Sequence, residues 1–381
     1  MARRQRRRQG IIILLTAFLL VVVVALMAMS IDTGYVYMAR AELQRSADAS
    51  AIAGASKLIE SAMASSSGTI ASGDVTNVRS TTASYAGYNH VTNHSLALAT
   101  EDIQVGQLAN PTNPASTFNF TNVGQFNAVH AHLRRTASQN GKVHMFFAPV
   151  LDRDSMSLTA DATAAFVANF TGFAAPTDLN QGNLKMLPFA LDLTTWNSLM
   201  AGTGTDTWKY NSATGAVTAG TDGVKECNLY PQGTGSPGNR GTVDIGGSNN
   251  STADIARQIV YGISQSDLNK MGGSLKFGAS GTLSLNGDTG ISAGVKDELD
   301  SIKGKPRIIP IFSTVAGPGN NAQYTIVKFA GVRLMEVVLT GKATSKRVMI
   351  QPAPMVVQGG IPATDSSQYT QFLFSPVRLV R

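Results

Sequence analysis

The run IIILLTAFLLVVVVALMAM, residues Ile11–Met29, decides the architecture of this chain. It carries no charge, and Thr16 is its one polar side chain. With a rise of ~1.5 Å per residue, a helix over this run is about 28 Å long, which matches the hydrocarbon thickness of a bilayer. A helix that is apolar on all sides belongs in a membrane or a deep core. We therefore predict a transmembrane helix over residues 11–31. Its anchor positions are Ile11, Leu15, Leu19, Val23 and Met29.

A cluster of arginines precedes the span, at Arg3, Arg4, Arg6, Arg7 and Arg8. Cationic flanks stay on the cytoplasmic side while the following segment is translocated. We therefore expect residues 1–10 to form a cytoplasmic tail and the bulk of the chain to be periplasmic or extracellular, anchored in the inner (cytoplasmic) membrane. The alternative is a cleavable signal peptide, for which Ala25, Ala28 and Ser30 supply the small residues.

The formal net charge of +7 comes mainly from this same arginine cluster. The rest of the chain is close to neutral and offers no basic face that could neutralise phosphates. We expect the membrane, and no nucleic acid, as a partner. The single cysteine, Cys227, excludes an intramolecular disulfide and is expected to be buried and inert, with an intermolecular link as the alternative.

The segment that follows, IDTGYVYMARAELQRSADASAIAGASKL, covers Ile31–Leu58. It places small and apolar residues on one side of a helix, at Val36, Leu43, Ala47, Gly54 and Leu58. We predict an Ala-rich stalk helix over residues 32–60, and its stripe would let a second helix or a sheet approach closely. The alternative is a helix that only lifts the head of the protein off the bilayer. Tyr35 and Tyr37 suit the outer membrane interface.

The order of these features resembles the N-terminal module of TadG-like proteins of the Tad (Flp) pilus-assembly system. The features are a basic cluster, a glycine, an aliphatic span, an Asp-x-Gly exit and an alanine-rich helix. The matching residues are Gly10, Asp32, Gly34, Tyr35, Tyr37, Ala39, Leu43, Gln44, Ala47, Asp48, Ala49, Ala51, Ala53, Gly54 and Ala55. A looser resemblance to TadE/TadG-like proteins covers Asn127–Phe166.

The resemblance implies a non-enzymatic, membrane-anchored component that supports pilus biogenesis or adhesion through contacts with other pilus-assembly or envelope proteins. In type IV pilins a glutamate stands at the fifth residue of the processed helix. Here Leu15 stands at that place, counting from Ile11. This departure favours an uncleaved anchor over a major filament subunit.

Beyond the stalk we predict an α+β fold with a β-rich extracytoplasmic region and a mixed or antiparallel sheet. A Ser- and Gly-rich linker is expected over residues 61–73, a pilin-like α+β domain over 74–170 and a C-terminal α+β domain over 184–381. In the first domain we predict a helix at Val75–Tyr88 and a short helix or strand at Val143–Val150. Its predicted strands are Glu101–Leu108, Gln125–Arg135 and Ser155–Val167.

In the second domain, Ser251 and Thr252 predict a capped helix start, and Ser264 with Asp267 a second short helix. Two long β-type runs are expected at Arg307–Val315 and Gln323–Thr340.

Chemical motifs are few. Two Asp-Thr-Gly triplets, residues 32–34 and 288–290, hint at an aspartic protease, but the first lies in the expected helix and the second follows a turn signal. His90 and His94 have i, i+4 spacing, and His130 and His132 share a strand face, without a third metal ligand implied. The glycine-rich segments 236–241 and 243–251 lack a phosphate-binding lysine. We expect no catalytic residue, cofactor or metal.

Two alternatives to the pilus role stay open. One is a membrane-tethered envelope binding protein or adhesin that serves no pilus. The other is a tethered hydrolase, for which Asp288, Asp297 and Glu298 are the available acids.

Overall fold

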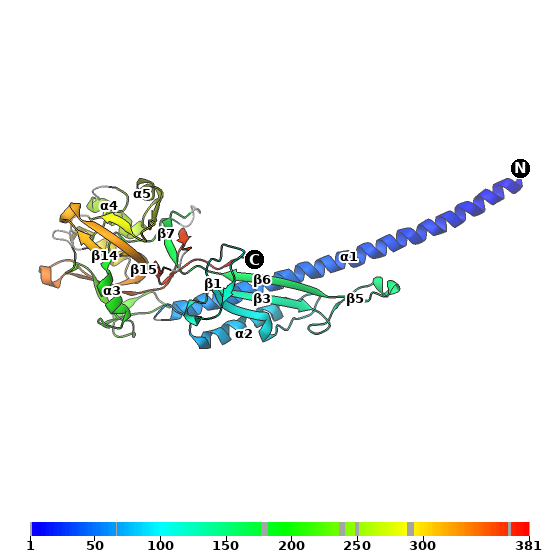
Figure 1. Cartoon of the computed structure of the whole chain (residues 1–381), viewed down its shortest axis with the longest axis horizontal. Coiled ribbons are helices and arrows are strands. Elements are labelled where there is room, and N and C mark those ends of the chain that lie inside the picture. The colour runs from blue at the N-terminus through cyan, green and yellow to red at the C-terminus, as the bar shows by residue number, and fades with distance from the viewer. Residues whose placement is uncertain are drawn as a thin grey trace.

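The computed structural model describes residues 2–65, 67–176, 182–235, 241–247, 251–287, 293–364 and 367–380. One helix, α1 (Ala2–Ala64), runs without interruption from the tail through the apolar span into the body of the protein. Figure 1 shows its N-terminal half projecting alone, its C-terminal half lying against a sheet, and a second lobe beyond that sheet. The fold is α+β, as predicted.

The first lobe packs α1 and α2 (Ser72–Tyr88) on an antiparallel sheet. The strand order in the sheet is β2 (Phe118–Asn119), β1 (Ile103–Leu108), β3 (Ala128–Arg135), β6 (Leu158–Ala165) and β21 (Arg378–Leu379). Strand β3 alternates with period 2, so Val129, Ala131 and Leu133 enter the core with α1. A hairpin of β4 (Val143–His144) and β5 (Ser155–Met156) extends from this lobe and carries the short 3-10 helix η3 (Ala148–Leu151).

The second lobe is built on a mixed sheet. Its strand order is β11 (Cys227–Tyr230), β16 (Arg347–Pro352), β15 (Gln323–Val338), β14 (Pro306–Ala316) and β8 (Leu191–Asp192), and β13 (Leu283–Asn286) and β19 (Thr370–Gln371) also pair with β15. Both faces are buried: Ile308 and Phe312 of β14 enter one core, whereas Ile309 and Ile311 enter another. Near-continuous apolar runs are the expected composition of strands covered on both faces.

Smaller elements cover this sheet. They are the three-stranded sheet β12 (Ser274–Lys276), β7 (Phe170–Ala174) and β18 (Gly360–Pro362), the pairs β9 (Trp208–Tyr210) with β10 (Val217–Ala219) and β17 (Met355–Val356) with β20 (Leu373–Phe374), and the helices α3 (Leu193–Met200), α4 (Thr252–Tyr261), α5 (Gln265–Lys270) and α6 (Lys296–Ser301). Further 3-10 turns are η1 (Thr100–Asp102), η2 (Val123–Gln125), η5 (Ala293–Val295), η6 (Gly319–Asn321) and η7 (Ala343–Ser345).

The C-terminal segment joins the cores of the molecule. Phe372 packs in the core on one face of the large sheet, Leu373 in the core on its other face, and Phe374 in the core of the first lobe against Phe166. The chain then ends in β21, which pairs with β6 of the first lobe. The last residues of the expected unit 184–381 therefore belong to the first sheet.

Most expected elements are present, with shifted ends. Helix Val75–Tyr88 and strands Arg307–Val315 and Gln323–Thr340 correspond to α2, β14 and β15. The run Val143–Val150, open between helix and strand, contains both β4 and part of η3.

Two of the predicted strands need correction. Strand Gln125–Arg135 begins only at Ala128, because the side chain of Asn122 accepts from Gly124 N and starts a 3-10 turn. Strand Ser155–Val167 is divided into β5 and β6. His90 and His94 share no helical face, because Thr92 and Asn93 take positive φ of 48° and 64° in a tight turn.

Candidate functional site

The apolar part of α1 presents its side chains outward. Leu15, Leu19, Val23 and Met29 are each more than a third exposed, and none of the most apolar stretch of the helix is buried. In the described part of the chain this is the one helix long and apolar enough to cross a membrane. Ile11 and the arginine cluster lie outside the residues whose side chains are described.

Hydroxyl groups along the span satisfy themselves within the helix. Thr16 Oγ1 donates to the carbonyl of Ile12 at 2.8 Å, and Ser30 Oγ donates to that of Leu26 at 2.8 Å. Back-bonding of this kind leaves no hydroxyl donor unpaired in hydrocarbon. The exposed surface of α1 is therefore suited to lipid.

The span ends at Asp32, which is buried although its neighbours on α1 are exposed. Its carboxylate accepts hydrogen bonds from the backbone N–H of Phe146 at 2.7 Å, of Phe147 at 3.0 Å and of Ala148 at 2.6 Å. Burial acts to raise the pKa of Asp32, but the three N–H donors outweigh it and lower the pKa below its ordinary value. Asp32 thus holds the β4–β5 loop as an ionised acceptor at the start of η3.

The Ala-rich part of α1 is the central helix of the first lobe. Leu43, Ala47 and Ala51 are fully buried along one stripe, together with Ala39, Ala55 and Leu58. The alternative of a helix that only lifts the head off the bilayer is therefore wrong for these residues. The small side chains let α1 lie against α2, β3 and β6 at once.

Gly54 marks a close approach of α1 to α2 and β3. A Cβ atom at this position would lie 2.2 Å from Oγ1 of Thr82 on α2 and 2.9 Å from Cγ1 of Val129 on β3. Gly34, the other glycine in this part of α1, has nothing within 4 Å. The two glycines therefore have different roles, and only Gly54 is required by packing.

The polar motif residues lie at the edge of the same contact. Gln44 is exposed and its amide donates both to Asp48 Oδ1 and to the backbone carbonyl of Asp161 on β6, each at 2.9 Å. Tyr35 is half-buried and its ring packs edge-on against Phe146, with 4.9 Å between ring centroids. Sequence spacing could not reveal Asp161 and Phe146 as partners, because each lies more than a hundred residues away from the residue it contacts.

The histidines of β3 sit on the face of the sheet opposite α1. His132 Nδ1 lies 2.6 Å and His130 Nε2 lies 3.3 Å from Asp161 Oδ1. Within the described residues, no group of three or more His, Cys, Asp or Glu side chains could hold a metal ion. This arrangement is a cross-strand polar cluster of β3 and β6.

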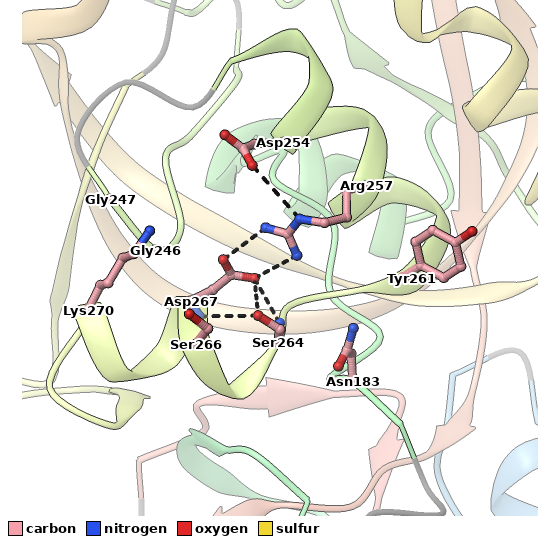
Figure 2. A pocket seen from close by; sticks show the side chains of 10 residues that line it. All are labelled: Asn183, Gly246, Gly247, Asp254, Arg257, Tyr261, Ser264, Ser266, Asp267 and Lys270. Carbon is pink, nitrogen blue, oxygen red and sulfur yellow. Dashed lines mark hydrogen bonds and ion pairs between the residues drawn. The ribbon is translucent and has the colours of Figure 1, made fainter.

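A cavity of about 610 Å³ lies in the second lobe between α4 and α5. Figure 2 shows that its acidic and basic side chains face each other. Arg257 donates to both carboxylate oxygens of Asp267, at 2.9 Å and 3.0 Å, and Asp267 also accepts from Ser264 N and Oγ. The Arg257–Asp267 pair joins the two helices. Ser251 and Ser264 cap the N-termini of α4 and α5, as predicted.

The remaining sequence candidates that the structure describes are not brought together. Asp288–Gly290 and residues 236–240 lie outside the described residues. Asp297 and Glu298 lie on α6, in its first turn. Cys227 has a free thiol on β11 and is half-buried, not fully buried as expected. Burial raises its pKa to about 12.

A family model described as "Putative Flp pilus-assembly TadE/G-like" matches residues 10–57. The match begins at the glycine before the span and ends within the buried stripe of α1. Residues 10–57 are a TadE/G-like segment. Neither the search of curated proteins nor the search of solved structures found a match.

The TadE/G-like segment therefore contains two structural parts in one helix. Its first part is the exposed apolar anchor, and its second part, from Asp32 onward, is the core helix of the first lobe. The match of this segment to a pilus-assembly family supports a pilus-related role. Among the described residues, α1 is the one helix that could serve as a membrane anchor.

Proposed function

We propose that this chain is a non-enzymatic, single-pass membrane component of Tad/Flp pilus assembly. Its extracytoplasmic lobes would contribute to pilus biogenesis or adhesion through contacts with other pilus or envelope proteins. The observation that carries the proposal is the family match over residues 10–57, which covers the anchor and the helix on which the first lobe is built.

The proposed topology places the arginine tail of residues 1–10 in the cytoplasm and the span of residues 11–31 in the inner membrane. The positive-inside rule supports this orientation. Both lobes then follow on the outer side, because α1 continues directly from the span into the first lobe. The role of the C-terminal unit within this scheme is contact with a partner protein.

The proposal favours a permanent anchor over a filament subunit. Leu15 is exposed and apolar at the place where type IV pilins carry a glutamate. A lipid environment suits Leu15 on every side, whereas a filament built by pilin-type pairing requires the carboxylate.

Deleting the gene in a bacterium that makes Tad pili tests the proposal. We expect the number of pili per cell, counted by electron microscopy, to fall, and the full chain to restore it. A matched variant in which residues 1–31 are replaced by a cleavable signal peptide should be exported and yet fail to restore pili. Unchanged piliation after deletion would contradict the proposal.

A further inference from the structure

The β4–β5 loop carries four large apolar side chains that are largely exposed to solvent. The exposed fractions are 63% for Phe146, 46% for Phe147, 87% for Val150 and 77% for Leu151. We call these four residues the apolar tip. Burial of such side chains is the ordinary outcome of folding, so a cluster of exposed ones marks a surface that is covered in the native setting.

The apolar tip is fixed to the end of the membrane span. Asp32, the first residue after residues 11–31, binds the backbone of Phe146, Phe147 and Ala148, and Tyr35 packs against the ring of Phe146. At ~1.5 Å per residue the span is about 31 Å long, which places Asp32 at the outer boundary of the hydrocarbon. Figure 1 shows the loop extending past the sheet along α1, toward the N-terminal end.

We propose that the apolar tip inserts into the outer leaflet of the membrane that α1 spans. Phe and Leu side chains partition into the boundary between headgroups and acyl chains, as they do on interfacial helices. The tip lies beside a helix that already crosses the bilayer, so lipid is the surface it meets first. The insertion gives the first lobe a second membrane contact, which fixes its height and its rotation about α1.

The charges next to the tip indicate which lipids it needs. Within the loop, exposed Arg153 lies between exposed Asp152 and Asp154, and the nearest lysine, Lys142, precedes β4. With no net positive charge, the loop has no reason to select anionic headgroups. Apolar contact alone drives the insertion, and vesicles of pure phosphatidylcholine should support it.

Spin labels on the full chain test the proposal. Val150→Cys and, separately, Leu151→Cys are labelled with a nitroxide and reconstituted in phosphatidylcholine vesicles. Thr214→Cys, in the exposed turn between β9 and β10, is the matched control. Native Cys227 is a half-buried free thiol, so it is replaced by serine in every labelled chain, and the Cys227→Ser chain serves as the labelling blank.

The readout is the accessibility of each label to oxygen, which concentrates in lipid, and to a water-soluble nickel chelate. At positions 150 and 151 we expect oxygen accessibility to exceed that of the chelate several-fold, with the opposite ratio at position 214. Equal chelate accessibility at 150, 151 and 214 would overturn the proposal. Labels shielded from both reagents would also overturn it, because they would show a protein contact in place of lipid. Neither result depends on the pilus role.

Discussion

Single residues of α1 mark where its surroundings change, from the exposed apolar surface suited to lipid to the packed core of the first lobe. Asp32 is the first position at which a carboxylate replaces aliphatic surface, and it is used to bind three backbone N–H groups. Gly54 is a position at which α1 has no room for a Cβ atom between Thr82 of α2 and Val129 of β3. Both residues lie in the TadE/G-like segment. The structure explains the presence of Asp32 by its hydrogen bonds and that of Gly54 by its close packing.

Replacing Gly54 with alanine should destabilise the protein, although alanine favours helix over glycine by about 1 kcal/mol. The new Cβ would overlap Thr82 and Val129, and overpacking of this kind costs about 1–3 kcal/mol. Gly34→Ala is the matched control on the same helix and should be neutral or slightly stabilising. Denaturant unfolding of the full chain in detergent measures both variants. A Gly54→Ala chain as stable as Gly34→Ala would contradict the packing account, and Thr82→Ala should relieve part of the cost in a double mutant.

Asp32→Ala should release the β4–β5 loop while the lobe remains folded. We expect the amides of Phe146, Phe147 and Ala148 to lose hydrogen-exchange protection, with β3 and β6 unchanged. Because the pKa of Asp32 is lowered in the folded protein, its contribution is complete above the ordinary carboxyl pKa of about 4 and is lost as the pH falls through the lowered value. Protection of these amides that is independent of both the substitution and acid pH would contradict the role of Asp32.

At the scale of elements, the ion pair between Arg257 and Asp267 stabilises the contact between α4 and α5. Asp267→Asn should lower the free energy of unfolding by about 1–2 kcal/mol, because Arg257 loses its bidentate partner but keeps contact with water. Asp254→Asn is the control, since its carboxylate lies 3.8 Å from Arg257 Nε and is half exposed. Equal stability of the two variants, measured by denaturant unfolding, would show that the pair at Asp267 is not what holds α5.

The elements that were predicted correctly are those with a clear periodicity of apolar residues in the sequence. The buried stripe of α1, which includes Leu43 and Ala47, has the period of a helix, and the apolar runs of β14 and β15 are typical of strands. The partner of Asp32 could not be predicted, because Phe146 lies 114 residues away. The turn at Thr92 and Asn93 could not either, since the histidine spacing fits a helix equally well and tertiary contacts decided the outcome.

At the scale of the whole molecule, the C-terminal segment returns from the second lobe to the sheet of the first lobe. Phe372, Leu373 and Phe374 enter three different cores in succession, and β21 then pairs with β6 at the edge of the sheet on which α1 packs. The pairing of the C-terminal segment with the first lobe could not be predicted from the sequence, because strands of two residues show too little periodicity. The segment Phe372–Phe374 therefore contributes side chains to the cores of both lobes.

Leu373→Ala should therefore affect both lobes. Loss of this buried side chain should cost about 2–5 kcal/mol, and we expect one calorimetric transition that shifts to lower temperature as a unit. Val356→Ala, at a half-exposed position on the adjacent strand β17, should shift it little. Two separate transitions, of which only one moves, would show that the lobes unfold independently.

The central claim is that one helix spans the membrane and carries both lobes outside the cytoplasm. Cysteine labelling of the full chain in bacterial spheroplasts with a membrane-impermeant maleimide tests it most directly, with Thr214→Cys reporting on the second lobe and Gln5→Cys on the N-terminal tail. Our account predicts that the Thr214→Cys chain is labelled in intact spheroplasts, that the Gln5→Cys chain is labelled only after lysis, and that both stay in the membrane pellet. Labelling of Gln5→Cys from outside, protection of Thr214→Cys, or recovery of the intact chain in the soluble fraction would contradict it.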